Sequence, residues 1–169
     1  ITVDGFVFRV DMRLRPFGDS GALAACFDAM EGYYQTQGRE WERYAMIKAR
    51  AITGSDAGKK MIMDLLRPFV YRRYLDYGML DAMREMKRMI AAELHKKGME
   101  ENIKLGRGGI REIEFIGQVF QLIHGGRDKS LQQRPILTIL DRLAQRGALS
   151  VETVAELKQA YDFLRRTEH

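Results

Sequence analysis

The chain has 169 residues, of which 46% are hydrophobic and 30% are charged, so it is long enough for one domain with a buried core. No hydrophobic run approaches the roughly 20 residues needed to span a bilayer, and the single cysteine, Cys26, excludes an internal disulfide. The net charge of +5 comes from basic residues spread along the chain, as on solvated helix faces, so we expect neither a nucleic-acid nor a membrane partner.

The first 15 residues alternate between hydrophobic and polar side chains. Asp4-Gly5 is a typical hairpin turn, so the alternation predicts two paired strands at residues 1–3 and 6–15. Two strands do not form a stable sheet by themselves. We therefore expect this hairpin to be the end of a larger sheet.

Asp11 stands among Arg9, Arg13 and Arg15 on the polar face of the second predicted strand. An aspartate in this position suits a divalent metal ion, and neighbouring arginines suit phosphate groups. A surface strand with several salt bridges has the same pattern. One carboxylate does not make a metal site, so partners elsewhere would have to complete it.

The remainder of the chain repeats hydrophobic residues at steps of three and four, which predicts six or seven amphipathic helices. We expect Ser20 to cap the first helix and Ser150 the last. Pro68 should bend or break the third, because proline lacks an amide donor. The predicted helices cover residues 20–38, 39–52, 59–77, 81–97, 110–124, 135–146 and 151 onward.

The stretch from residue 102 to residue 127 is central to the chain. Its glycines precede a helix with one hydrophobic face and one polar face, the latter formed by Arg111, Glu114, Gln118 and Gln121. Glycines at a helix N-terminus can present backbone amides to an anion. An ordinary turn before an amphipathic helix explains the same pattern, and spacing alone does not separate these two interpretations.

Four segments, in this order, resemble the family of bifunctional glutamine synthetase adenylyltransferase/adenylyl-removing enzymes. Within these segments, the motifs I-R-E-I-E-F (residues 110–115) and I-K-A-R (residues 47–50) are similar to the N-terminal, adenylyl-removing half of that family. The four are V-D-M-R-L-R-P-F-G-D-S-G (Val10–Gly21), Y-Y-Q-T-Q-G-R-E-W-E-R-Y-A-M-I-K-A-R (Tyr33–Arg50), F-V-Y-R-R-Y-L-D-Y (Phe69–Tyr77) and I-K-L-G-R-G-G-I-R-E-I-E-F (Ile103–Phe115).

The resemblance implies the end of a polymerase-β-like nucleotidyltransferase sheet at residues 1–18 and a helical bundle domain at residues 19–169, which is a mainly α fold, α+β overall. In this family three strand carboxylates hold two Mg²⁺ ions. Asp11 matches the third, and the first two lie in an upstream G-S-x-x-D-x-D motif. We therefore expect the chain to be inactive by itself.

The implied reaction is phosphorolysis, in which inorganic phosphate removes AMP from an adenylylated tyrosine of glutamine synthetase and forms ADP. The implied partners are glutamine synthetase, the PII signal protein, ADP or ATP, and phosphate, in the cytoplasm. A non-catalytic helical module that docks glutamine synthetase or PII remains an alternative. Asp11 is the expected catalytic and metal residue, and weaker candidates for binding phosphate or nucleotide are Arg13, Arg15, Lys104, Gly106, Gly108, Gly109, Arg111 and Glu114.

The candidates between residues 104 and 114 match a signature of the family, which leaves their role open. They either contact the nucleotide or lock the helical domain onto the catalytic sheet. Arg107 stands where relatives commonly have a small residue, which puts close backbone approach to a ligand in doubt.

Overall fold

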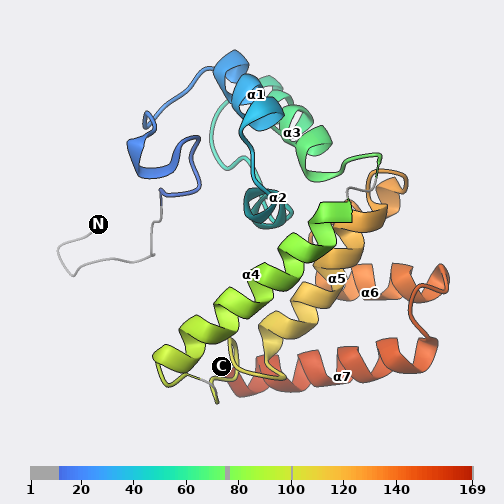
Figure 1. The fold of residues 1–169 in the computed structure, drawn as a ribbon. Coiled ribbons are helices and arrows are strands. Elements are labelled where there is room, and N and C mark those ends of the chain that lie inside the picture. Colours follow the sequence, from blue (N-terminus) through green and yellow to red (C-terminus); the bar gives the residue numbers. More distant parts are fainter. Residues whose placement is uncertain (1–11, 75–76, 100, 169) are drawn as a thin grey trace.

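The computed structural model describes residues 12–74, 77–99 and 101–168. Within these ranges the chain forms seven α-helices and no strand (Figure 1), as the helical periodicity predicts, and none of these helices is long and apolar enough to cross a membrane. The helices are α1 (Phe27–Thr36), α2 (Glu40–Met46), α3 (Asp56–Val70), α4 (Tyr77–Lys96), α5 (Ile110–His124), α6 (Ile136–Gln145) and α7 (Val151–Glu168). Two short 3-10 turns lie at Gly18–Ser20 and Lys129–Leu131.

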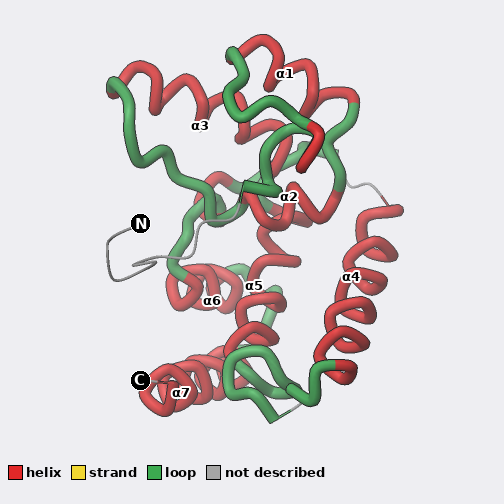
Figure 2. The backbone as a smooth tube through the Cα atoms, turned by 90° about the vertical axis from the view of Figure 1, so that its left-hand side faces the viewer, coloured by secondary structure: helices red, strands yellow, loops and turns green. Residues whose placement is uncertain are grey.

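The helices form two groups around α5. Helices α1 and α3 pack together above α2, whereas α6 packs beside the middle of α5 and α7 near its lower end (Figures 1 and 2). Each group has its own cluster of buried hydrophobic residues, and α5 contributes Leu122 to the first and Ile113 to the second. Because one helix belongs to both clusters, it joins the two halves of the fold.

Helix α2 is fastened to α3 through Arg43, whose side chain is only 1% exposed. Its guanidinium donates hydrogen bonds to the main-chain oxygens of Phe69 at 3.0 Å and Val70 at 3.1 Å, the last two residues of α3. It also pairs with Glu40. A cation at this position satisfies carbonyl groups that a helix end leaves unpaired.

The serine caps follow the prediction at one end of the chain only. The Ser150 hydroxyl accepts a hydrogen bond from the Thr153 amide and caps α7, as expected. Ser20 does not cap the first helix, which begins at Phe27. Its hydroxyl donates to the carbonyl of Phe17 at 2.8 Å at the end of the 3-10 turn, and Cys26 holds the N-cap position of α1.

Several predicted boundaries also need correction. Helix α2 ends at Met46 rather than near residue 52, because the next amides bond to carbonyls three residues earlier and tighten the chain into turns. Pro68 does not break α3, which continues to Val70. The predicted hairpin lies mostly outside the described residues, and its last part, residues 12–15, forms turns and a bend.

Candidate functional site

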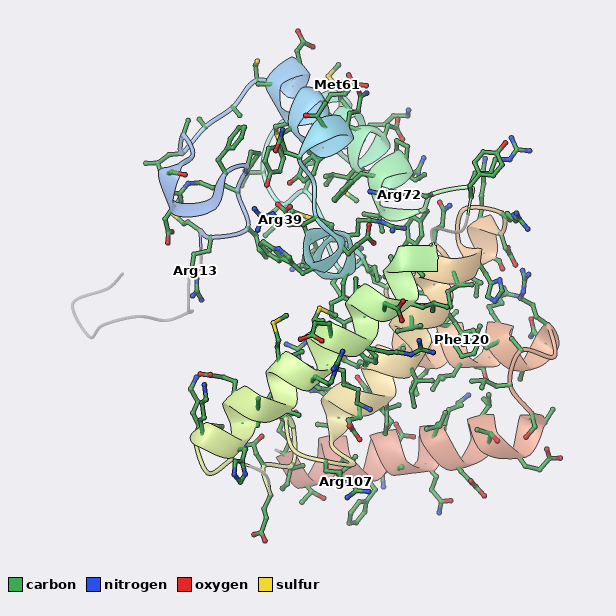
Figure 3. All side chains as sticks on the ribbon, in the orientation of Figure 1. Arg13, Arg39, Met61, Arg72, Arg107 and Phe120 are labelled. Atoms are coloured by element: carbon green, nitrogen blue, oxygen red, sulfur yellow. The ribbon has the colours of Figure 1, made fainter. Side chains whose placement is uncertain are left out.

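The predicted metal residue Asp11 lies outside the described residues, so its geometry stays a prediction. The two candidate arginines that follow it lie in the N-terminal loop, where Arg13 is exposed (Figure 3). The Arg15 guanidinium donates to the carbonyls of Met12 at 2.8 Å, Asp19 at 3.1 Å and Gly21 at 3.0 Å. This side chain therefore shapes its own loop by crossing from one side of it to the other.

The other six candidates come together at the start of α5. We call residues 102–114 the signature segment. In its first half, the Asn102 side chain accepts hydrogen bonds from the amides of Lys104 and Leu105. Figure 3 shows Arg107 of this segment beside α7, far from Arg13 in the N-terminal loop. The structure thus separates the candidates into two groups.

Two of the signature glycines have a structural reason. Gly108 has a φ of 73°, in the left-handed region that favours glycine. Gly109 is buried, and a Cβ there would lie 2.6 Å from the carbonyl oxygen of Ile103 and 2.9 Å from that of Gly106. Glycine therefore allows the chain to fold back on itself before α5 begins.

The backbone amides at the start of α5 all have partners within the chain. The Gly108 amide donates to the Glu112 carboxylate at 2.9 Å, which is the main reason that the pKa of Glu112 is lowered. The amides of Ile110 and Arg111 donate to the carbonyls of Ile103 and Lys104 at 3.1 and 2.9 Å. Those of residues 109 and 112 bond to carbonyls of the same segment. These donors are consequently engaged in folding the segment.

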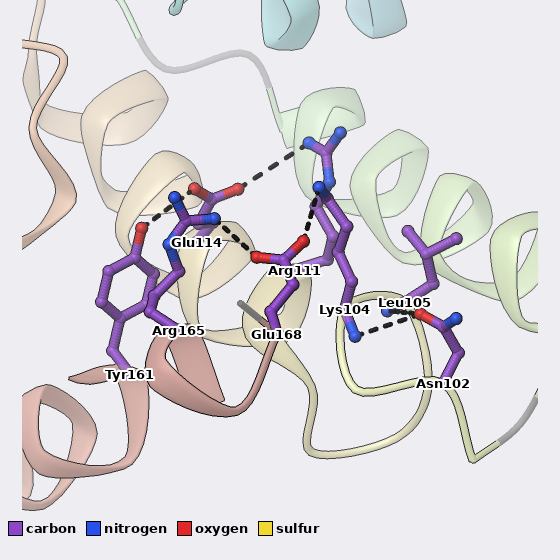
Figure 4. A network of polar contacts seen from close by, with 8 residues as sticks. All are labelled: Asn102, Lys104, Leu105, Arg111, Glu114, Tyr161, Arg165 and Glu168. Atoms are coloured by element: carbon purple, nitrogen blue, oxygen red, sulfur yellow. Dashed lines mark hydrogen bonds and ion pairs between the residues drawn. The ribbon is translucent and has the colours of Figure 1, made fainter. Parts of the chain in front are cut away.

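Charged side chains connect the signature segment to the end of α7 (Figure 4). Lys104 Nζ lies 2.8 Å from Glu168 Oε1, and Arg165 lies 2.8 Å from the other oxygen of Glu168. One turn into α5, Glu114 accepts a hydrogen bond from the Tyr161 hydroxyl at 3.5 Å and lies 3.8 Å from Arg111. We call these six residues, Lys104, Arg111, Glu114, Tyr161, Arg165 and Glu168, the signature network.

The polar face of α5 continues into the interior. Gln118 and Gln121 are 2% and 0% exposed. The Gln121 amide donates to the carbonyls of Leu131 at 2.6 Å and Gln133 at 2.7 Å, which ties the loop before α6 to α5. The side-chain oxygen of Gln118 has no hydrogen-bond partner among the described residues. The sequence predicts that this polar face of α5 contacts solvent or a ligand, but the side chains of Gln118 and Gln121 are buried within the protein.

Helix α2 and the turn after it contribute two further polar groups that sequence reasoning missed, Tyr44 and Lys48. Burial raises the pKa of Tyr44 to about 12, and Arg111 and Glu114 of α5 affect it electrostatically in opposite directions. Burial also lowers the pKa of Lys48, which donates a hydrogen bond to the Arg134 carbonyl at 2.7 Å. Tyr44 lies in α2 and Lys48 in the turn that follows it, and their i, i+4 spacing in the sequence is the signal that would have paired them.

Two family models match the chain. A model described as glutamate-ammonia ligase adenylyltransferase matches residues 1–64, and one described as GlnD PII-uridylyltransferase matches residues 84–169. Both descriptions name enzymes that transfer a nucleotidyl group. The chain is therefore similar to parts of nucleotidyl-transferring enzymes over most of its length.

Curated relatives narrow this class. Three named bifunctional glutamine synthetase adenylyltransferase/adenylyl-removing enzyme come from Pseudomonas putida (63% identical over 100% of this chain), Pseudomonas aeruginosa (62% over 100%) and Hahella chejuensis (63% over 99%). The chain belongs to this family of bifunctional enzymes. It spans 17% of the length of each of these relatives.

Proposed function

We propose that the chain is part of an enzyme that removes AMP from adenylylated glutamine synthetase by phosphorolysis. Inorganic phosphate attacks the adenylyl phosphorus, the bond to the tyrosine oxygen breaks, and ADP and unmodified tyrosine are formed. The observation that carries the proposal is identity above 60% across the whole chain to enzymes named for this bifunctional activity. The I-R-E-I-E-F motif at residues 110–115 supports the assignment of the chain to the adenylyl-removing half of the family.

Magnesium is the metal that the family resemblance implies. The described residues contain no cluster of three or more histidine, cysteine, aspartate or glutamate side chains that fits a metal ion. They do not form a metal site by themselves, so the proposal assigns the metal to Asp11 together with carboxylates of the catalytic sheet. When bound, two Mg²⁺ ions would stabilise charge on the attacking and leaving oxygens.

Within this proposal the signature segment holds α5 and α7 of the helical domain together. Its amides donate to acceptors in the chain, and Lys104 and Glu114 connect it to α7. This arrangement disfavours direct contact between the nucleotide and the glycine amides, and contact of the segment with the catalytic sheet stays a prediction. The exposed guanidinium of Arg111, which is 54% exposed, remains a candidate for phosphate contact.

Partners and compartment follow from the same proposal. The enzyme would act on adenylylated glutamine synthetase in the cytoplasm, respond to PII, and use ADP or ATP and phosphate. The second candidate function is a helical module that docks glutamine synthetase or PII without catalysis. The predominance of helices among the described residues favours that candidate for the 169 residues taken alone.

The test is phosphate-dependent ADP release from adenylylated glutamine synthetase, with magnesium, by a full-length protein that contains this chain. Asp11→Asn should reduce the rate by more than about a hundredfold if Asp11 holds the metal. The matched control is Asp19→Asn in the neighbouring loop, which should retain the rate. The 169-residue chain alone should release no ADP.

Each result decides between the two functions. Activity that survives Asp11→Asn would show that the metal assignment is wrong. Inactive full-length wild type that still binds glutamine synthetase would favour the docking module. Rapid ADP release by the 169-residue chain would contradict its proposed inactivity.

A further inference from the structure

A cavity of about 550 Å³ lies between the segment after α2, one side of α3 and the loop before α6. One part of its wall is hydrophobic and includes Met46 and Met63, and it continues into the buried residues Leu66 and Val70 of the first hydrophobic cluster. The volume is within the range of small-molecule sites, about 300–1,000 Å³. The cavity therefore has room for a ligand with an apolar part.

The charged residues that line this cavity are all cationic. They are Arg50, Lys59, Arg67 and Arg134, and no aspartate or glutamate joins them. Lys59 and Arg67 each pair with an aspartate of their own helix, at 3.5 and 3.0 Å. The guanidinium groups of Arg50 and Arg134 form no ion pair or hydrogen bond with the rest of the described chain. Two arginines therefore remain available to an anion.

The chemistry of these groups selects the class of ligand. A guanidinium presents a planar fork of donors that fits phosphate oxygens in a bidentate manner. Methionine side chains are flexible and polarisable, which suits a flat ring packed against them. Cations beside a methionine-containing wall match a molecule with phosphate at one end and a base at the other. An extended acidic peptide would use the cations but not the hydrophobic wall.

We propose that this cavity binds a nucleoside phosphate, with Arg50 and Arg134 on the phosphate groups and the base against Met46 and Met63. The proposal goes beyond the proposed function, because none of the residues assigned to phosphorolysis lines the cavity. It also explains why arginines at two distant points of the sequence, on segments joined by the bond from Lys48 to the Arg134 carbonyl, lie around one space.

The test is calorimetric titration of the 169-residue chain with ADP, adenosine and pyrophosphate in separate experiments. ADP should bind more tightly than either fragment. Arg50→Gln and Arg134→Gln should each raise the Kd for ADP about tenfold or more, because each removes one guanidinium from the phosphate groups. Both side chains are exposed, so the variants should fold. The matched control is Arg166→Gln on exposed α7, which should leave the Kd unchanged.

The outcomes that overturn the proposal are specific. Absent ADP binding, or binding that both cavity variants leave unchanged, would exclude this site. Equal affinity for pyrophosphate and ADP would exclude recognition of the nucleoside. Tighter binding of a glutamate-rich peptide, lost in the same variants, would assign the surface to an acidic peptide instead. None of these titrations depends on phosphorolysis, so the two proposals fail independently.

Discussion

Lys104 in the signature segment and Glu168 in the last turn of α7 form an ion pair of 2.8 Å across 64 residues of sequence. Glu168 also pairs with Arg165 of its own helix, which orients the carboxylate toward the segment. Together with the bond from Tyr161 to Glu114, this contact joins the beginning of α5 to the end of α7. The signature network thus has a structural function that does not depend on any ligand.

The first prediction concerns this ion pair. Lys104→Met and Glu168→Gln should each lower the free energy of unfolding, and the double variant should show a coupling of about 0.5 kcal/mol, since Lys104 is half-exposed and solvent screens the pair. Denaturant unfolding of the four proteins measures this coupling. Lys96→Met on exposed α4 is the control and should change stability little. Additive effects would show that the pair does not contribute.

The second prediction contrasts two glycines. Gly109→Ala should cost about 2 kcal/mol of stability, because the new methyl group would lie 2.6 Å from a backbone oxygen that cannot move away freely. Gly32→Ala, within exposed α1, meets nothing within 4 Å and should stabilise the chain by about 0.5–1 kcal/mol. Thermal unfolding of both variants measures the difference. Similar effects at both positions would contradict the proposed close packing of the segment.

The third prediction concerns Arg43. Arg43→Met should destabilise the fold by about 3 kcal/mol, because the carbonyls of Phe69 and Val70 lose buried charged donors. Urea unfolding gives this value. The control is Arg84→Ala. Arg84 and its ion-pair partner Asp81 are both exposed to solvent on α4, so this change should alter the free energy of unfolding by less than about 0.5 kcal/mol. A small effect of Arg43→Met would mean that α3 does not need this cap.

The sequence predicts the helices well because their hydrophobic stripes are long and their ends carry glycine or serine. Gly125 follows α5 directly, and Ser150 caps α7 through a local hydrogen bond. Local signals fail where a different local structure takes the place of the helix start. Ser20 is a residue type that commonly caps helices, yet it ends a 3-10 turn and α1 begins only at Phe27. Where a helix begins depends in part on packing that periodicity does not describe.

Burial of polar side chains is the part that the sequence does not predict. Gln118 and Gln121 have the spacing of an outward face, but the loop before α6 folds over them and accepts hydrogen bonds from Gln121. Trp41 is 43% exposed, whereas the carboxylate of its neighbour Glu42 is buried and accepts a hydrogen bond from Tyr33. Burial of these side chains depends on contacts between segments that are distant in sequence, and neither composition nor hydrophobic periodicity predicts such contacts.

The last prediction concerns His124, the final residue of α5. A helix C-terminus normally favours the charged form of histidine. In this structure the pKa of His124 is lowered from its ordinary value of 6.5. Burial of the imidazole is the largest cause, and repulsion from the positive charges of Arg146 and Arg127 adds to it. The unfolded chain therefore binds this proton more readily than the folded chain. The resulting stability is present above about pH 6.5 and is lost as the pH falls through the lowered pKa.

His124→Gln should accordingly reduce the difference between the free energies of unfolding at pH 7.5 and pH 5.5. Arg127→Gln keeps the histidine but removes one positive charge, so it should give an intermediate dependence on pH. Urea unfolding at both pH values, with the wild type in parallel, measures these differences. Because other groups also titrate in this interval, the comparison rests on the change between variants. An unaltered dependence in His124→Gln would show that burial beside two arginines does not govern this residue.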